Sequence, residues 1–337
     1  MKTAVIFGGS GFIGCHFSNY LINDCGFDRI YLCDLVEPNF TRFGPDVVDN
    51  STSGAIKYLF ADVREPINLA IDTSIDLIAN FAAIHREPGH EPFEYYETNL
   101  KGAENVCSWA EQVDCSKLIF TSSIAPYGVA EKTTTEDTLP VPFSAYGGSK
   151  LAAEKIHLAW QASDKITRKL VIVRPGVVFG PGEGGNVTRL VKAVLSRYFF
   201  YMGNKHTRKA GTYVKELCNA MWWVLNERCD GGVSLFNMSL NPGPTIEEYV
   251  DTVCEVSLVK RFVPSVPFGA LYVMSLIVDP VAKLLGINQP ISPVRIKKLV
   301  KSNNVIPKFL ADAGYQYRYS FKEAMKDWRQ SQPNDWQ

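Results

Sequence analysis

Short apolar runs alternate with amphipathic stretches along the first half of the chain. The runs are rich in β-branched and aromatic residues, and they read TAVIF, IYLCDL, IKYLF, IDLIANFAA, KLIFTSS and KLVIVRP. Most of them are separated by segments of helical length with one apolar face. Strand and helix repeated in this order predict an α/β fold in which a doubly wound parallel sheet is covered by helices on both faces.

This alternation loosens after Pro175, where Gly- and Pro-rich links such as GPGEGG and NPGP separate helical stretches. The stretches lie near residues 186–197, 213–227, 245–257 and 268–285. We therefore expect a first domain over 1–175. We expect a smaller, mostly helical substrate lobe over 176–337 that is interleaved with the first domain and not joined to it by a flexible linker.

Charge and cysteine content narrow the class of protein. The 337 residues include 35 basic and 35 acidic side chains, so there is no electrostatic case for binding nucleic acid. Eight cysteines occur without a C-x-x-C pair, which favours reduced thiols over a zinc site or a disulfide framework. The apolar run after Lys2 breaks after Phe7 into glycines, as in a strand that enters a turn and unlike an export signal. These features predict a cytoplasmic protein without a metal site.

The segment 263–278 carries no charged residue. It contains Pro264 and Pro267, ends before Asp279, and is short for a membrane span. We expect it to form a buried or interfacial helix of the second lobe. Peripheral contact with the inner face of a membrane is the alternative interpretation.

A glycine-rich turn follows the first apolar run. Residues 8–14 read GGSGFIG, a G-x-x-G-x-x-G turn that opens a helix. Missing side chains let the backbone approach a pyrophosphate at the positive end of the helix. The residues expected at this pyrophosphate are Gly8, Gly11, Phe12, Ile13 and Gly14. The pattern is typical of dinucleotide binding in a Rossmann-type domain.

Acidic residues at later strand ends extend this cofactor site. Asp34 ends the second strand and can accept hydrogen bonds from both hydroxyls of the adenosine ribose. Its charge would repel a 2′-phosphate, and the two apolar residues that follow supply no cation to offset that repulsion. The expected cofactor is therefore NAD and not NADP. Asp62 and Val63, at the end of the third strand, are expected to meet the adenine.

A Y-x-x-x-K pair supplies the candidate chemistry. Tyr146 and Lys150 are four residues apart, so they share one face of a helix. A phenol with its ordinary pKa of about 10 is a poor base, but a fixed ammonium nearby favours the phenolate and moves that pKa toward the working range. Lys150 can also hold the nicotinamide ribose. Ser123 can donate a hydrogen bond to a substrate oxygen that changes between alcohol and carbonyl.

Together these motifs resemble the extended short-chain dehydrogenase/reductase family, in its sugar-nucleotide epimerase/dehydratase branch. The resemblance covers the chain to about residue 230 and rests on Gly8, Gly11, Gly14, Asp34, Asp62, the NFAA strand end, ETNLKGAENV, Ser123, Tyr146 and Lys150. It implies that Ala82 and Ala83 line the cofactor cleft and that Asn99 braces the active site. Pro175 and Val177 would lie beside the nicotinamide.

The two residues after Ser123 select among the reactions of this branch. The 4,6-dehydratases of this branch carry an Asp-Glu pair at these two positions, which supplies an additional acid and base. The sugar-acid decarboxylases carry a glutamate at the second of them. This chain has Ile124 and Ala125 instead. Such a pair still permits chemistry that needs only hydride and proton transfer at one carbinol. A purely structural interpretation, in which Ile124 and Ala125 pack against the sugar or Tyr146, stays open.

We therefore expect an NAD-dependent sugar 4-epimerase that works through a transient 4-keto intermediate in glycan precursor synthesis. An NAD-dependent dehydrogenase or reductase of a sugar or steroid-like alcohol is a rival, because it uses the same three catalytic residues. A cofactor-binding regulatory protein on the same fold is a second, non-enzymatic rival. The intact catalytic residues argue against the second rival.

The second lobe indicates a diphosphate-linked substrate. The stretch RPGVVFGPGEGGNVTRLV resembles the diphosphate-binding region of epimerases, with Asn186 at a helix start where N–H groups favour anions. Lys209 stands where those enzymes carry an arginine, and Arg295 is another candidate cation for the phosphates. One contact is absent, because the asparagine usual in those enzymes is Val177 here. A solvated surface charge is the plain alternative for each cation.

Other stretches resemble bacterial epimerases that act on undecaprenyl-diphosphate-linked N-acetylhexosamine. They are FTSSIAPYG, GNVTRLV, KAGTYV, ISPVRIKKLV and the apolar segment 263–278. A lipid-linked substrate needs a diphosphate site but no uridine pocket, and it would give this apolar segment a reason to approach a membrane. A nucleotide-linked sugar is the other carrier that the resemblance allows.

Two expectations concern the surroundings of the catalytic residues. Helices expected near 90–113 and 145–162 resemble those that form a four-helix dimer interface in this family, so we expect a homodimer. His85 follows the fourth strand, at the carboxyl edge where ligands bind in open α/β sheets. It is a candidate for contact with the substrate, and the alternative is a loop histidine with only structural hydrogen bonds.

Overall fold

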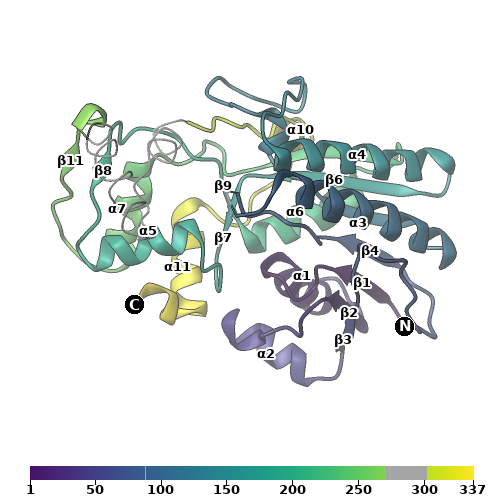
Figure 1. Cartoon of the computed structure of the whole chain (residues 1–337). Helices are drawn as coiled ribbons and strands as arrows, with labels where there is room; N and C mark the ends of the chain where they lie inside the picture. Colours follow the sequence, from purple (N-terminus) through teal and green to yellow (C-terminus); the bar gives the residue numbers. More distant parts are fainter. Residues whose placement is uncertain (88, 271–272, 274–301) are drawn as a thin grey trace.

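A seven-stranded parallel sheet forms the centre of the computed structural model, which describes residues 1–87, 89–270, 273 and 302–337 (Figure 1). Its strand order is β10-β6-β5-β4-β1-β2-β3. The strands are β1 (Thr3–Phe7), β2 (Arg29–Asp34), β3 (Ile56–Phe60), β4 (Leu77–Asn80), β5 (Lys117–Thr121), β6 (Lys169–Pro175) and β10 (Val233–Met238). The order reverses between β1 and β4, and ligands bind in such folds at the carboxyl ends of the strands beside this reversal.

Helices cover both faces of this sheet. They are α1 (Phe12–Asn23) and α6 (Val214–Glu227) on one face, and α3 (Pro92–Gln112) and α4 (Ala145–Ser163) on the other. Each face is closed by its own cluster of buried side chains, with Phe17 and Leu217 in one and Trp109 and Trp160 in the other. The central strands β1 and β4 are buried along their whole length because both faces of the sheet are covered, whereas the edge strand β3 is partly exposed. The doubly wound parallel fold predicted from the apolar runs is confirmed.

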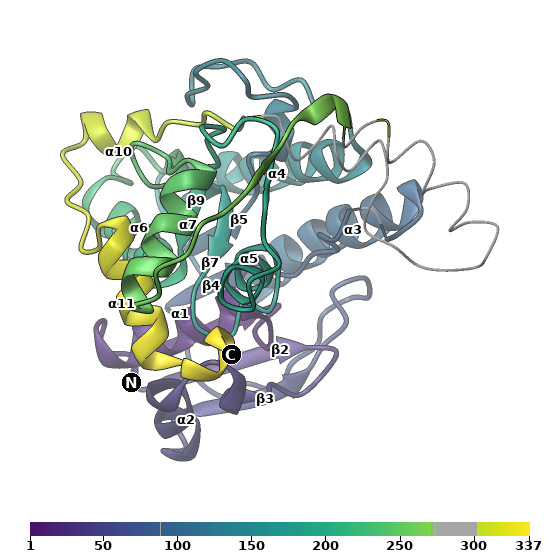
Figure 2. The same ribbon diagram turned by 90° about the vertical axis from the view of Figure 1, so that its left-hand side faces the viewer.

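The chain leaves the sheet at the carboxyl end of β6 and forms a second lobe, which faces the viewer in Figure 2. Its elements are β7 (Val177–Phe179), α5 (Asn186–Leu195), β8 (Tyr201–Met202), β9 (Gly211–Tyr213), α7 (Ile246–Val256), β11 (Ser265–Val266), α11 (Phe321–Ser331) and η3 (Pro333–Trp336). The core of the lobe includes Phe179, Tyr213, Tyr249 and Trp328. The shorter elements elsewhere are η1 (Phe40–Arg42), α2 (Pro45–Thr52), η2 (Ala125–Tyr127) and α10 (Lys308–Asp312).

The helices predicted near 186–197, 213–227 and 245–257 are α5, α6 and α7. Of these, α6 packs against β6 and β10, so residues beyond 175 contribute to the sheet domain as well as to the second lobe. Thr245 begins α7 as its N-cap residue, and its side chain accepts a hydrogen bond from the Glu248 N–H at 3.1 Å. This cap marks the start of the helix in the sequence, and the backbone N–H groups of Ile246 and Glu247 also donate to the carbonyls of Thr207 and Lys205.

Parts of the sequence predictions lie outside the described residues. The uncharged segment 263–278 is described over 263–270 and at 273, where it contains β11. Arg295 falls entirely outside the described ranges. Within those ranges, no helix has both the length and the apolar character that crossing a bilayer requires.

Contacts from distant segments hold the GPGEGG loop, residues 180–185. Burial lowers the pKa of His16 to about 4, so the neutral ring of this α1 residue can donate from Nε2 to the carbonyl of Pro181 at 2.8 Å. Arg42 donates from Nε to the next carbonyl at 2.7 Å, and Asp335 accepts from an N–H of the same loop at 2.7 Å. The helix that opens the glycine turn and the C-terminal turn therefore position this loop together.

Candidate active site

The glycine turn leaves no room for side chains. Gly8 has a φ of +72°, and a Cβ there would lie 2.5 Å from the backbone N of Ala82. A Cβ on Gly14 would lie 2.5 Å from the carbonyl O of Gly9. Between them, the Ser10 hydroxyl is buried and has no hydrogen-bond partner in the described part of the chain. Glycines whose backbone can closely approach a ligand, and a buried hydroxyl that can still donate a hydrogen bond, both fit the pyrophosphate of a dinucleotide.

The helix that follows presents its positive end to this turn. Gly11 is the N-cap residue of α1, and Phe12 and Ile13 begin the helix. A glycine has no side chain with which to cap the N–H groups of the first helical turn. Those groups carry the partial positive charge of the helix dipole, which stabilises an anion at this point.

Asp34 lies beside the turn at the end of β2. Its carboxylate accepts hydrogen bonds from the backbone N–H of Ser10 at 3.0 Å and from that of Leu35 at 2.8 Å. Burial raises the pKa of Asp34, and these two hydrogen bonds lower it. The carboxylate is thereby oriented at the place where the sequence predicts contact with the adenosine ribose.

Asp62 has a partner that the sequence did not reveal. Arg64 binds its carboxylate in a fork, with Nε 2.9 Å from Oδ1 and Nη2 2.6 Å from Oδ2, and this ion pair lowers the pKa of Asp62. Val63 is buried, and its carbonyl accepts a hydrogen bond from Asn105 on α3 at 2.8 Å. Any contact of Asp62 with the adenine would therefore compete with Arg64 or be shared with it.

Ser123, Tyr146 and Lys150, the candidate catalytic trio, come together at the carboxyl end of β5. The Ser123 hydroxyl lies near enough to the Tyr146 phenol to lower its pKa, and its oxygen accepts a hydrogen bond from the Ala125 N–H at 3.1 Å. Lys150 is buried on the first turns of α4, and its Nζ donates to the carbonyl of Thr121 at 2.8 Å. The structure thus places a hydroxyl, a phenol and an amine around one strand end.

The electrostatics of the trio differ from the sequence-based expectation. Burial raises the pKa of the Tyr146 phenol, and only the neighbouring Ser123 hydroxyl lowers it. The net direction is therefore opposite to the lowering that was predicted from the Lys150 ammonium. Burial also lowers the pKa of Lys150 to about 7, because a desolvated ammonium is disfavoured, so its charge is only partial at neutral pH.

A buried ion pair behind the trio escaped sequence reasoning. Arg174 on β6 donates to both carboxylate oxygens of Glu154 on α4, at 2.8 and 2.6 Å, and Ser122 donates to the same carboxylate at 2.5 Å. Glu154 lies one helical turn after Lys150, and its negative charge raises the lysine pKa against the effect of burial. The i, i+4 spacing of Lys150 and Glu154 was the only sequence signal for this arrangement.

Ile124 and Ala125 have packing partners. Ile124 contacts an apolar cluster of Ala130, Ala210 and Val305, which joins the sheet domain to the second lobe. A Cβ on Gly147 of α4 would lie 2.6 Å from the Ala125 carbonyl. These contacts favour the structural interpretation of the pair, and the pair still brings no acid or base to the trio.

The loop after β4 crosses the cofactor turn and reaches the trio. Asn99 on α3 binds both backbone groups of Ile84, accepting at 3.0 Å and donating at 3.2 Å, and it also donates to Ser149 on α4 at 2.9 Å. Asn99 thereby connects the loop after β4 to α4, and its bracing of the active site stays a prediction. His85, next in the loop, hydrogen-bonds to the backbone of Ala83. Burial lowers the pKa of His85, and the charge of nearby Lys150 lowers it further.

The second lobe places Lys209 near β7, the short strand that follows β6 in the chain. The Pro175 carbonyl accepts from the Ile124 N–H at 3.2 Å, and the Val177 N–H donates to the Ala210 carbonyl at 2.7 Å. This pairing of β7 with β9 places Lys209 directly beside the chain leaving β6. Burial lowers the pKa of Lys209 to about 8, so the residue stays mostly charged at neutral pH.

The start of α5 already holds an acid. Glu183 accepts hydrogen bonds from the backbone N–H of Thr188 at 2.9 Å and from its hydroxyl at 2.5 Å. The Asn186 side chain accepts a hydrogen bond from Arg189 at 2.7 Å. A diphosphate bound here would meet the Glu183 carboxylate, so the anion contact predicted at Asn186 would require Glu183 to move or to be neutralised.

Comparisons with known proteins agree with this geometry. The family model described as "NAD dependent epimerase/dehydratase family" matches residues 4–238. The chain is 26% identical over 326 residues to the N-acetyl-alpha-D-glucosaminyl-diphospho-ditrans,octacis-undecaprenol 4-epimerase of Escherichia coli O157:H7, with 95% of this chain and 92% of the relative covered. It is 28% identical over 237 residues to the decarboxylating sterol-4-alpha-carboxylate 3-dehydrogenase of Candida albicans, with 65% and 63% covered.

Among solved structures, the chain resembles the UDP-N-acetylglucosamine 4-epimerase from Methanobrevibacter ruminantium M1 in complex with UDP-N-acetylmuramic acid. The TM-score is 0.74 at 19% identity, and 98% of this chain and 97% of that chain are covered. At this identity the likeness shows a shared fold. Because the family model spans well over half of the sequence, the chain belongs to the NAD-dependent epimerase/dehydratase family.

Proposed function

We propose that this protein is an NAD-dependent sugar 4-epimerase, acting on an N-acetylhexosamine that is linked through a diphosphate to its carrier, in glycan precursor synthesis. One observation carries the proposal: the trio is assembled, and the adjacent Ile124 and Ala125 add no second acid or base. Such a site can oxidise and reduce one carbinol, but it lacks the groups that would eliminate water.

The cofactor would lie along the carboxyl edge of the sheet. The glycine turn and the Ser10 hydroxyl fit its pyrophosphate, and Asp34 fits the adenosine ribose. NAD, when bound, supplies reversible hydride transfer at C4 of the sugar. The remaining steps belong to side chains of this chain.

Tyr146 would take the proton of the sugar 4-hydroxyl as the 4-keto sugar forms. It would return the proton after the keto sugar has rotated, so that its opposite face is turned toward the nicotinamide side of the site. The Ser123 hydroxyl already lies near the phenol and can hold the same substrate oxygen throughout. Burial opposes the phenolate, so the charged form of Lys150 is needed when the proton moves. The inverted configuration at C4 results with no net redox change.

The carrier that we favour is a polyprenyl diphosphate. The relative that aligns over nearly the whole chain is named for a substrate of this kind. Lys209, charged at neutral pH and next to the strand that leaves β6, would bind the diphosphate. A nucleotide-linked sugar is the second candidate, because the solved structural relative is named as a UDP-sugar epimerase.

We also propose that the enzyme is a cytoplasmic homodimer. Helices α3 and α4 pack side by side over one face of the sheet. Phe93 and Tyr96 are exposed on α3 and would be covered by the same helices of a second copy. Analytical ultracentrifugation would show a dimer, and a strictly monomeric species would contradict this part of the proposal.

The test of function is product analysis by NMR after incubation with UDP-N-acetylglucosamine and, separately, with undecaprenyl-diphosphate-linked N-acetylglucosamine. Nicotinamide absorbance is recorded at the same time. A galacto product without accumulating NADH establishes epimerisation, and the tube that contains it identifies the carrier. Failure of both substrates to change would refute the substrate assignment.

A net dehydrogenase is the rival that a specific observation supports. The match to a sterol dehydrogenase covers about two-thirds of this chain, and the trio suits both reactions. A dehydrogenase would release NADH in proportion to a keto product, whereas an epimerase would release none. Appearance of stoichiometric NADH in the same assay would therefore replace the epimerase proposal.

A further inference from the structure

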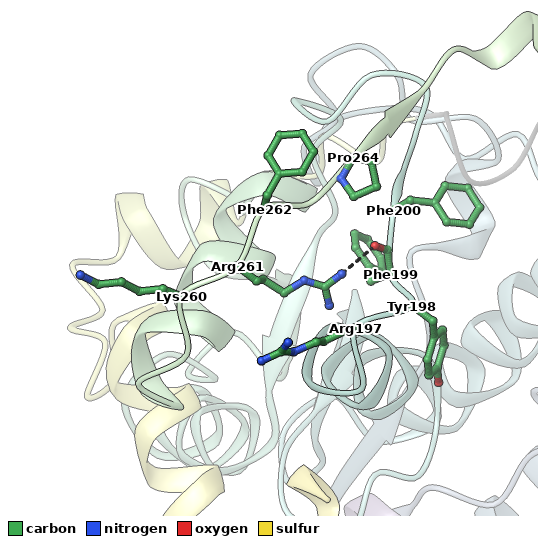
Figure 3. Close-up of a pocket in the computed structure, with 8 residues that line it drawn as sticks. All are labelled: Arg197, Tyr198, Phe199, Phe200, Lys260, Arg261, Phe262 and Pro264. Carbon is green, nitrogen blue, oxygen red and sulfur yellow. Dashed lines mark hydrogen bonds between the residues drawn. The ribbon is translucent and has the colours of Figure 1, made fainter.

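A basic and aromatic surface lies on the second lobe, outside the catalytic site. Eight residues line a shallow pocket there, in two segments that are far apart in sequence (Figure 3). We call this surface the basic-aromatic patch, and it consists of Arg197, Tyr198, Phe199, Phe200, Lys260, Arg261, Phe262 and Pro264.

The patch joins positive charge to exposed apolar area. Three of its eight residues are cations and none is an acid, in a chain whose formal net charge is zero. Phe262 is 86% exposed and Tyr198 is 65% exposed. Among the acids of the neighbouring helix α7, Glu255 is paired with Lys322, and the charges of exposed Asp251 and of Arg261 both act on the pKa of Cys254. Cations beside exposed aromatic rings are the combination found at protein surfaces that enter the headgroup region of a bilayer.

The patch is built into the lobe. Arg261 donates to the carbonyl of Phe199 at 3.1 Å and also binds the carbonyl of Val194, so it ties the two segments together. Figure 3 shows the Arg261 side chain pointing inward toward Phe199, while Lys260 and Phe262 on either side of it project outward. The adjacent strands β8 and β11 pair in register just beyond these residues. The exposed groups are therefore carried by an ordered scaffold.

The patch stands at one end of α5 and the predicted diphosphate region at the other. The helix has ten residues, from Asn186 to Leu195, and is therefore about 15 Å long. The GPGEGG loop precedes its first residue, and the 197–200 segment of the patch follows its last. A diphosphate at the GPGEGG end of α5, once Glu183 had moved or been neutralised, would lie within roughly this distance of the bilayer surface if the patch rested on it.

We propose that the basic-aromatic patch docks the second lobe on an anionic phospholipid bilayer. Arg197 and Lys260 match the negative lipid headgroups, and Phe262 and Tyr198 insert at the boundary of the acyl chains. The inference rests on the proposed function, because docking would present the catalytic site to a substrate that cannot leave the membrane. It deepens that function by naming the surface that makes the contact.

The test is co-sedimentation of the full chain with vesicles of phosphatidylcholine containing about 30% phosphatidylglycerol, compared with phosphatidylcholine alone. Wild-type protein is expected to bind the anionic vesicles and to bind less at high salt. The variant K260E/F262S is expected to bind them at least about tenfold more weakly. The matched control is K165E/I166S, which removes one exposed lysine and one exposed large apolar residue from the turn between α4 and β6.

Binding that is unchanged in K260E/F262S, or equal loss in the control variant, would overturn the proposal. Absence of wild-type binding to anionic vesicles would overturn it as well. Epimerisation of UDP-N-acetylglucosamine, or of a short-chain polyprenyl analogue in detergent, is measured in parallel and should be the same in both variants and the wild type. Loss of vesicle binding with retained epimerisation in detergent separates failure of the docking surface from failure of the proposed function.

Discussion

The cofactor half of the molecule, the sheet domain with the glycine turn and the trio, differs from the substrate lobe in how its candidate residues are positioned. In the cofactor half, Gly8, Asp34 and Ser123 each lie at or just after the carboxyl end of a strand, and the parallel sheet brings those ends together. In the substrate lobe, the 180–185 loop is held by side chains from α1, η1 and the C-terminal turn. The first arrangement follows from local sequence order, whereas the second exists only after distant segments have packed.

Lys150 of the cofactor half and Lys209 of the substrate lobe also differ in their surroundings. Burial lowers the pKa of Lys150 to about 7 and that of Lys209 to about 8. Lys150 has a compensating acid one turn away, because Glu154 raises its pKa. For Lys209, burial is the cause of the lowered pKa. A negatively charged substrate bound beside Lys209 would favour its ammonium form and raise that pKa.

The largest effect is expected from Tyr146→Phe, in the cofactor half. Removal of the proton-transferring hydroxyl should lower kcat by about 10²–10⁴-fold while NAD binding stays within about twofold. Steady-state kinetics and NAD titration measure the two quantities. Tyr198→Phe, at an exposed phenol of the other lobe, is the control and should leave the turnover of a nucleotide-linked sugar unchanged. Substantial activity in Tyr146→Phe would remove this residue from its role.

Glu154→Gln should cause the next largest effect, on stability. The variant leaves the buried Arg174 guanidinium without its anion, which is expected to cost about 3–5 kcal/mol in the free energy of unfolding. Urea denaturation measures this loss. Glu255→Gln, at an exposed pair with Lys322, should cost less than about 1 kcal/mol. Equal losses in the two variants would show that burial does not distinguish these pairs.

Asp34→Asn tests the cofactor preference. Loss of the charged acceptor should weaken NAD binding by about tenfold and narrow the difference between NAD and NADP. Isothermal titration with both cofactors gives the two affinities. The same change at Asp62 should weaken NAD binding less, because Arg64 already binds that carboxylate. A larger loss at Asp62 than at Asp34 would reverse their assigned importance.

The smallest effect is a pH dependence in the substrate lobe. The Lys209 ammonium is charged below its pKa of about 8 and loses its charge as pH rises through that value. The KM for the diphosphate-linked substrate should therefore rise by about fivefold above this pH, with kcat changing less. Lys209→Arg keeps its charge and should flatten the profile. An unchanged rise of KM in the arginine variant would assign the titration to another group.

Several features were accessible from the sequence because they depend on short-range order. The strand and helix alternation, the glycine turn and the i, i+4 pair of Tyr146 and Lys150 are each contained in a few consecutive residues. A parallel sheet then places successive strand ends at one edge whatever the side chains elsewhere. The fold, the family and the assembly of the trio could therefore be predicted without coordinates.

Other features could not be predicted, because they depend on burial and on contacts between segments far apart in the chain. The ion pair between Arg174 and Glu154 joins strand β6 to helix α4. The direction of the Tyr146 pKa shift depends on how deeply the phenol is buried. Neither the ion pair nor the pKa shift can be inferred from the spacing of residues in the sequence.

The sequence by itself determined the parallel fold and the cofactor, since local hydrophobic period and turn chemistry specify them, and the Y-x-x-x-K spacing identified the candidate trio. Only the tertiary structure decided that Arg174 and Glu154 form a buried ion pair and that residues near 197 and 260 form one surface. Those outcomes arise because packing sets which charges are buried, which are paired and which stay exposed to solvent.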